Sequence, residues 1–143
     1  MPQDDPFDLQ RFVDAQDKVI DDVRAELRAG RKRSHWIWFV FPQIEGLGVS
    51  SNSQFYALKS LAEAEAYLSH PVLGPRLREC VGLVIAAHDR SLQEIFGEPD
   101  ATKFRSSLTL FDLAATTDTI FADALKTFCG GKSDPATLAR LEP

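Results

Sequence analysis

The sequence predicts an all-α fold in which residues 1–143 form a single compact domain of short helices. Apolar residues recur at three- and four-residue steps along most of the chain, which is the spacing of amphipathic helices. Proline and glycine stand where that spacing starts and stops. No strand with a clear partner is visible. Hydrophobic residues make up 44% of the chain, which is enough to build a core.

The first helix is expected over residues 8–29. Its apolar stripe runs from Phe12 to Leu27, with Asp and Arg on the other faces. Asp8 is a candidate cap for the first turn, because a short carboxylate accepts hydrogen bonds from free N–H groups there. Gly30 is a natural stop.

A second element is expected at residues 36–41, six apolar positions in a row that Pro42 ends. A run this short fits a buried strand or a buried helical turn, and we choose a short buried helix because no partner strand follows. Residues 43–53 are expected to form a Gly/Ser-rich loop, with Ser51 or Ser53 capping the next helix.

The other helices follow from capping residues and apolar stripes. We expect two short helices at 54–60 and 61–69, the second with a Ser60–Glu63 capping box. A longer helix is expected from Pro71 or Pro75 along the stripe Leu77–Ile85, followed by a short one at 91–96 that ends before Gly97. The last three are expected after Asp100 along Phe104, Leu108 and Phe111, at 120–128 before Gly130-Gly131, and after Pro135, where Ser133 or Asp134 opens the helix.

Charge narrows the class of partner. The formal net charge is −5, and residues 1–22 hold seven Asp against Arg11 and Lys18. An acidic chain binds nucleic acid and anionic membranes poorly, so neither is an expected partner. One local patch, Arg28 to Arg33, has the opposite sign.

The compartment predicted is the cytoplasm. No apolar run reaches the length of a membrane span, and the N-terminus lacks the basic and apolar regions of a secretory signal. Cys80 and Cys129 are the only cysteines, and they are most simply explained as unpaired thiols in a reducing compartment. The three histidines show no metal-ligand spacing, so we expect no metal and no cofactor.

The densest functional signal is a cationic cluster, Arg31-Lys32-Arg33, that continues into His35, Trp36 and Trp38 and ends at Gln43. Such a junction can hold an anionic group on Lys or Arg while an aromatic face stacks on a planar ring. The simpler alternative is a solvated turn followed by core aromatics.

Two weaker signals accompany it. The stretch Gly46–Ser53, which contains Ser50, combines flexible backbone with hydroxyls ahead of a helix and is a candidate anion site. Glu45 beside it is the best-placed general base. Lys103 and Ser107 share a helix face and could bind phosphate, as part of a polar group with Asp100, Arg105, Ser106 and Thr109. The simpler explanations are an ordinary capped loop, a solvated carboxylate and an ordinary exposed helix face, and the patterns themselves favour these.

Several blocks resemble a known bacterial family. They include Asp5-Pro6-Phe7, the run Gly30–Gln43 with Ser-His-Trp-x-Trp-Phe-x-Phe-Pro-Gln, Gly46-Leu-Gly-x-Ser, Ile95-Phe-Gly, Asp100-x-x-Lys-x-x-Ser-Ser-x-Thr-Leu-Phe and Phe128-x-Gly-Gly. The family is that of domain of unknown function 1810. The resemblance implies a small, soluble, largely helical protein and names no catalytic residue. Some members carry the label calpastatin, which a chain with a full set of core aromatics does not support.

A shorter stretch is similar to the NADAR group. Ser53-Gln-Phe-Tyr56 followed by Lys59, and Pro71-Val-Leu-Gly-Pro-Arg76, carry this similarity. It implies a helical protein that hydrolyses N-glycosidic bonds in ADP-ribose-like or riboflavin-pathway compounds, with the Ser-x-x-Tyr helix lining the pocket.

Two hypotheses follow. In the first, the protein binds or processes a phosphorylated, nucleotide-derived small molecule, with hydrolysis of a C–N glycosidic bond as the most concrete reaction. Phosphate would be held by Lys32 and Arg76, with Ser50 and Lys103 as further ligand contacts. Trp36 or Trp38 would stack on the base, Tyr56 and Gln43 would orient the sugar, and Glu45 or His35 would move the proton. In the second, the chain is a non-catalytic helical interaction or regulatory module.

Overall fold

The computed structural model describes residues 5–141, and within that range it is all-α, with ten helices and no named strand. The helices are α1 (Gln10–Asp17), α2 (Ile20–Arg28), α3 (Ile37–Val40), α4 (Ser51–Phe55), α5 (Leu61–Ser69), α6 (Leu73–Ala86), α7 (Leu92–Phe96), α8 (Asp100–Ala114), α9 (Ile120–Cys129) and α10 (Pro135–Leu141). A parallel bridge joins Ile44 and Leu58.

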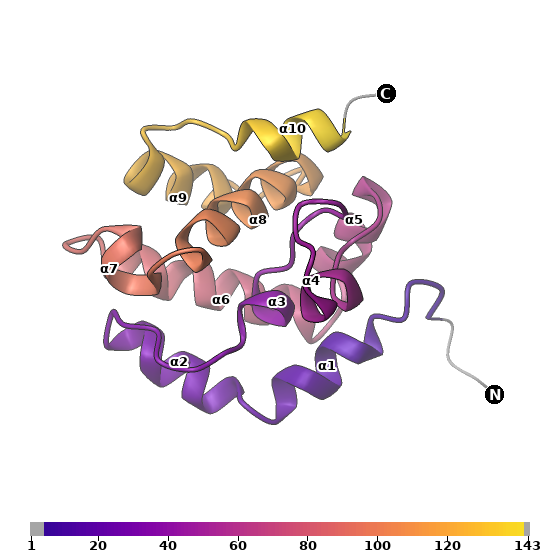
Figure 1. Ribbon diagram of the computed structural model, residues 1–143, viewed down its shortest axis with the longest axis horizontal. Helices are drawn as coiled ribbons and strands as arrows, with labels where there is room; N and C mark the ends of the chain where they lie inside the picture. The colour runs from indigo at the N-terminus through magenta and orange to yellow at the C-terminus, as the bar shows by residue number, and fades with distance from the viewer. Residues whose placement is uncertain (1–4, 142–143) are drawn as a thin grey trace.

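The two longest helices, α6 and α8, organise the others (Figure 1). Helix α8 contacts α5, α7, α9 and α10, whereas α6 contacts α2, α5 and α9. Helices α1 and α2 therefore lie on one side of the molecule, and α9 and α10 lie on the other. The core forms between these two sides.

Aromatic side chains fill much of that core. The ring of Phe41, directly after α3, lies 4.7 Å from Phe104 of α8 and 6.1 Å from both Trp36 and Phe96. Trp36, Phe41 and Phe104 are each no more than 1% exposed. The apolar run at 36–41 is thus a buried helical turn, as predicted, and it contacts α8.

The expected helix over residues 8–29 is interrupted. Helix α1 ends at Asp17 and α2 begins at Ile20, with Val19 between them at φ −134°, ψ −2°. The break follows from two different packing partners, since α1 contacts α3 and α2 contacts α6. One straight helix could not reach both.

The predicted cap of this first helix is wrong as well. Asp8 has a positive φ of 51° and does not cap. The carboxylate of Asp5 accepts hydrogen bonds from the N–H groups of Leu9 (2.7 Å) and Gln10 (3.0 Å) instead. The turn at residues 5–8 brings that carboxylate to the free N–H groups of the first turn.

The helix expected at 54–60 lies earlier, at Ser51–Phe55, and Ser50 rather than Ser51 or Ser53 caps it by accepting a hydrogen bond from Ser53 N. After Phe55 the chain runs to Leu58, whose N–H donates to Gln43 O. This bridge prevents the helix from continuing. The predicted caps at Ser60 for α5 and Asp134 for α10 are confirmed. The second half of the expected Ser60–Glu63 box does not form, because the Glu63 carboxylate accepts a hydrogen bond from Lys59 N instead.

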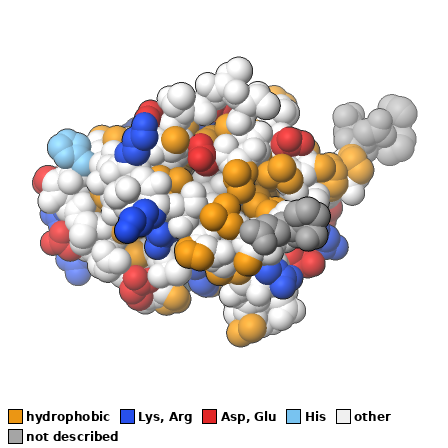
Figure 2. All heavy atoms as spheres, turned by 90° about the horizontal axis from the view of Figure 1, so that it is seen from above, with side chains coloured by type: hydrophobic (Ala, Val, Ile, Leu, Met, Phe, Trp, Pro, Cys, Tyr) orange, Lys and Arg blue, Asp and Glu red, His pale blue; other side chains and the backbone are white. Residues whose placement is uncertain are grey.

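The surface carries exposed hydrophobic side chains as well as charged ones. Viewed from the α9–α10 side, several hydrophobic side chains gather in one area of the face (Figure 2). The large hydrophobic side chains with the greatest exposure are Val49, Phe55, Leu113 and Leu138. Within residues 5–141 no helix combines the length and the apolar character needed to cross a bilayer.

Candidate functional site

Near the contact between α3 and α8 the structure places four predicted site residues, Lys32, Trp36, Trp38 and Lys103. Lys32 forms an ion pair with Asp100 at 2.8 Å, and its ammonium lies 4.9 Å from the ring centroid of Trp36. The Lys32 side chain is only 5% exposed. Both residues are therefore engaged inside the protein, and we assign them no ligand.

Glu26 of α2 organises the loop that carries these residues, and sequence reasoning missed it. Its carboxylate accepts hydrogen bonds from the N–H groups of Arg33 (2.8 Å) and Ser34 (3.1 Å), the Ser34 hydroxyl (2.6 Å) and Trp36 Nε1 (3.0 Å). Burial by itself would raise the pKa of Glu26, but these hydrogen bonds outweigh it and lower the pKa to about 2. The predicted basic–aromatic junction is thus held by an ionised carboxylate.

Trp38 and Lys103 form the second half of this cluster. Lys103 Nζ lies 5.7 Å from the Trp38 ring centroid, within the range of a cation–π contact. Trp38 is half-buried, and its Nε1 is a buried donor without a hydrogen-bond partner among the described residues. Ser107 Oγ on α8 shares that property.

The other predicted residues are dispersed. Arg76 pairs with Asp17 (2.9 Å) and with Gln16 (3.4 Å) across the α1–α6 contact. His35 is exposed and Gln43 is half-buried. The structure does not gather these residues around one cavity with Lys32.

Glu45 and Tyr56 line two separate hollows beside α4. Glu45 is exposed and contributes, with Gly46, Gly48 and Ser53, to a hollow of about 390 Å³. Tyr56 lies in an open groove of about 440 Å³ with Phe39 and Phe55. Ser50 is occupied as the α4 cap and is not among the residues lining either hollow.

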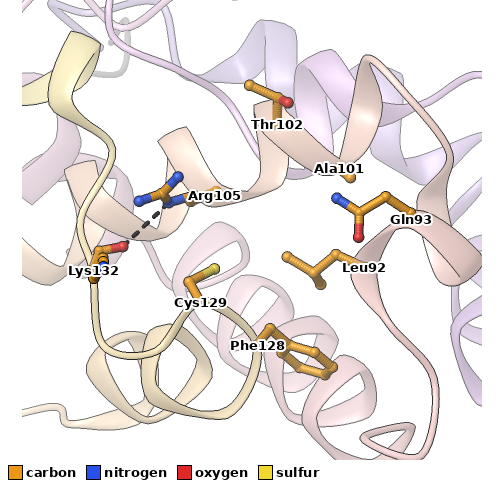
Figure 3. Close-up of a pocket in the computed structure, with 8 residues that line it drawn as sticks. All are labelled: Leu92, Gln93, Ala101, Thr102, Arg105, Phe128, Cys129 and Lys132. Carbon is orange, nitrogen blue, oxygen red and sulfur yellow. Dashed lines mark hydrogen bonds between the residues drawn. The ribbon is translucent and has the colours of Figure 1, made fainter.

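The pocket with the most suitable chemistry lies between α7, α8 and the end of α9 (Figure 3). Its volume is about 280 Å³, close to the lower end for small-molecule sites. Apolar and polar side chains share the lining: Leu92, Gln93, Ala101, Thr102, Arg105, Phe128, Cys129 and Lys132. In Figure 3 the Cys129 thiol and the Leu92 side chain point into the space between the helices. We call it the α7–α8–α9 pocket.

The charge of this pocket is positive. Arg105 and Lys132 line it, no carboxylate does, and within residues 5–141 neither cation forms an ion pair. Arg105 donates from Nε to Lys132 O (3.2 Å) and from Nη2 to Ser133 O (3.0 Å), which fixes the guanidinium. Its Nη1 makes no hydrogen bond within the described part of the chain.

Two titratable groups in or beside the pocket have shifted pKa values. Burial raises the pKa of the Cys129 thiol, and the positive charge of Arg105 offsets part of that rise. Outside the lining, Glu98 accepts hydrogen bonds from Thr102 and Gln93, and the Thr102 hydroxyl is the main cause of its lowered pKa. Sequence reasoning named Arg105 and the Phe128-x-Gly-Gly block separately; only the fold brings them together with Gln93 and Thr102.

No group of three or more His, Cys, Asp or Glu in residues 5–141 is arranged to hold a metal ion. The fold and the site therefore define a class: a small all-α protein with a cationic pocket between three helices. The chain belongs to the family described as protein of unknown function (DUF1810), whose model matches residues 6–141. This finding confirms the resemblance in the sequence blocks.

A solved structure of high similarity is the conserved hypothetical protein Rv1873 from Mycobacterium tuberculosis, determined at 1.38 Å. It shares 54% sequence identity with this chain, and the match covers 96% of this chain and 98% of that one with a TM-score of 0.94. A search of curated proteins finds no match.

Proposed function

We propose that the protein binds a phosphorylated, nucleotide-derived small molecule in the α7–α8–α9 pocket. The observation that carries this proposal is the pair of cations, Arg105 and Lys132, which line a pocket of mixed apolar and polar side chains without a carboxylate to neutralise them. Uncompensated positive charge at a partly enclosed site favours an anion, and a planar guanidinium suits phosphate oxygens.

The remaining lining residues suit the rest of such a ligand. Phe128 and Leu92 offer an apolar surface for a base or sugar face. Gln93 and Thr102 offer polar atoms, and hydrogen bonds to Glu98 already hold both side chains in place. Because neither Glu45 nor His35 lines this pocket, the proposal is for binding, and hydrolysis of an N-glycosidic bond stays a further prediction.

A thermal-shift screen of the purified protein tests the proposal. The compounds tested are inorganic phosphate, AMP, ADP-ribose, NAD and ribose 5-phosphate, and adenosine serves as the control without phosphate. A ligand that binds only the folded state at about 100 times its Kd adds roughly 2.7 kcal/mol of stability. We expect a rise in Tm with a phosphorylated compound that exceeds the rise with phosphate or with adenosine alone.

A matched pair of variants locates the binding. Lys132→Ala removes an exposed cation of the pocket, and Lys126→Ala removes an exposed cation of α9 that does not line it. The shift should shrink in Lys132→Ala and persist in Lys126→Ala. Equal shifts in both variants would place the ligand elsewhere, and no shift with any compound would reject the proposal.

The interaction module remains the second candidate. The observation that favours it is the exposure of hydrophobic side chains, above all Val49 at 90% and Phe55 at 58%. Exposed apolar groups that gather on one surface are typical of contact sites for other molecules. A failed ligand screen followed by recovery of a specific partner through a Phe55-dependent contact would support this function.

A further inference from the structure

The exposed face of α2 carries opposite charges at its two ends. Its exposed residues are Asp21, Asp22, Ala25, Arg28 and Ala29, and at 3.6 residues per turn these positions form one stripe. The acidic residues stand at the start of the stripe, Ala25 stands near its centre, and Arg28 stands near its end. Helix α2 lies at the outer edge of the fold, and its other face packs against α6 (Figure 1).

Two charges on this stripe are unsatisfied within the protein. Arg24 pairs with Glu79 (3.1 Å) and Asp21 (3.4 Å), so those three residues are already matched. Neither Asp22 nor Arg28 forms an ion pair with any described residue. Unmatched charges of opposite sign on one face favour a partner whose charges are reversed.

We propose that the α2 face is the contact surface for a second copy of this chain, which binds with its own α2 antiparallel. A twofold axis through Ala25 places the residue three positions before it opposite the residue three positions after it in the partner. Asp22 therefore faces Arg28 of the second copy, and Arg28 faces its Asp22. The same axis places Asp21 opposite Ala29 of the second copy, so no like charges meet.

The rest of the face permits close approach. Ala25 and Ala29 are small, and the antiparallel arrangement sets the positive end of each helix dipole against the negative end of the other. Beyond the helix, Arg31 and Arg33 are exposed as well. A second copy is an occupant with matching charges, because its own α2 presents Asp22 and Arg28 in the reverse order when the two helices run antiparallel.

The expected association is weak and sensitive to salt. A helix of nine residues is about 13 Å long, and a pair of such helices buries less than the roughly 1,200 Å² of a stable interface. Exposed ion pairs are screened by dissolved salt. Sedimentation velocity should therefore reveal a dimer that grows with protein concentration at low ionic strength and dissociates when salt is added.

Charge reversal tests the pairing directly. Asp22→Arg and Arg28→Asp each set like charges against one another and should weaken dimerisation by at least about tenfold. The double variant Asp22→Arg/Arg28→Asp exchanges both partners and should restore the dimer. Lys126→Asp changes an exposed charge on α9 and should leave it unchanged. All four variants change only exposed residues, and circular dichroism checks that each variant is folded.

Three results would overturn the proposal. The wild-type chain could stay monomeric at high concentration and low salt. The single variants could dimerise like the wild type. The double variant could fail to recover the dimer lost in the single variants, which would exclude the pairing of Asp22 with Arg28.

Discussion

Arg11 and Glu63 form a nearly buried ion pair, with Arg11 Nη2 3.2 Å from Glu63 Oε2 and side-chain exposures of 11% and 3%. Arg11 also donates to four backbone carbonyls, those of Phe7, Asp8, Phe55 and Ala57. One side chain thus fastens the N-terminal turn and the segment after α4 to α1. Its N–H groups are committed to the fold, although Arg11 borders two surface hollows.

Removal of the Arg11 guanidinium should therefore reduce stability sharply. Arg11→Met keeps a long apolar side chain but leaves Glu63 as a buried, unpaired carboxylate, which typically costs about 3–5 kcal/mol. Urea unfolding measures the change. The control is Arg24→Met, which breaks exposed pairs and should cost about 1 kcal/mol or less. Equal losses in the two variants would contradict a special role for Arg11.

Acid should weaken the loop that Glu26 holds. The pKa of Glu26 falls from its usual value of 4.5 to about 2 in the folded protein, so the folded state favours the ionised form. The stabilisation is complete above the unfolded pKa and is lost as the pH falls from about 5 towards 2. Glu26→Gln removes the charge and should cost about 1–3 kcal/mol at neutral pH.

Thermal unfolding of both proteins across that pH range checks this prediction. The difference in stability between the wild type and Glu26→Gln should narrow as the solution becomes more acidic. A constant difference from neutral pH down to pH 3 would show that the carboxylate is not the group that titrates.

The sequence predicts elements well where the determining signal is local. Ser60 with Glu63 placed α5 at its observed bounds, and Pro42 marked the end of the buried turn at 36–41. The break near Val19 was missed, because it depends on where α3 and α6 lie in space. Nothing within residues 8–29 contains that information.

The same limit explains the candidate site. The sequence around Lys32 predicts a phosphate-binding lysine, but in the fold Asp100, which is far away along the chain, neutralises its charge. The α7–α8–α9 pocket is formed by residues from 92 to 132, and no local pattern joins Gln93 to Cys129. The residue types predict anion binding, but tertiary contacts determine which Lys and Arg side chains remain available to bind an anion.

Two glycines should respond in opposite directions to the same substitution. Gly46 has a φ of +98°, a backbone conformation that strains any residue with a Cβ, and a Cβ there would also displace the Arg140 guanidinium, whose Nε donates to Glu45 O. Gly46→Ala should therefore cost about 1–3 kcal/mol. Gly82 lies inside α6, where a Cβ meets only Ile120 Cδ1 at 3.9 Å. Gly82→Ala should stabilise the protein by about 0.5–1 kcal/mol.

Calorimetry of the two variants tests both signs at once. A lower Tm for Gly46→Ala with a higher Tm for Gly82→Ala is the expected result. If both variants are destabilised, α6 has less room at Gly82 than the structure gives it.

The two cysteines should differ in reactivity, and this difference offers a second probe of the pocket. Burial raises the pKa of Cys80 to about 12 and leaves its side chain fully covered, whereas Cys129 is half-buried and lies in the α7–α8–α9 pocket beside Arg105. Because the thiolate is the reactive form, both thiols should react slowly at neutral pH, Cys129 faster than Cys80. A thiol-specific chromophoric reagent should modify one thiol in the folded protein and two after unfolding. A phosphorylated ligand that raises the Tm should also slow the modification of Cys129, because the bound ligand would block the access of the reagent to the thiol in the pocket. Modification at an unchanged rate in the presence of that ligand would place its binding site outside this pocket.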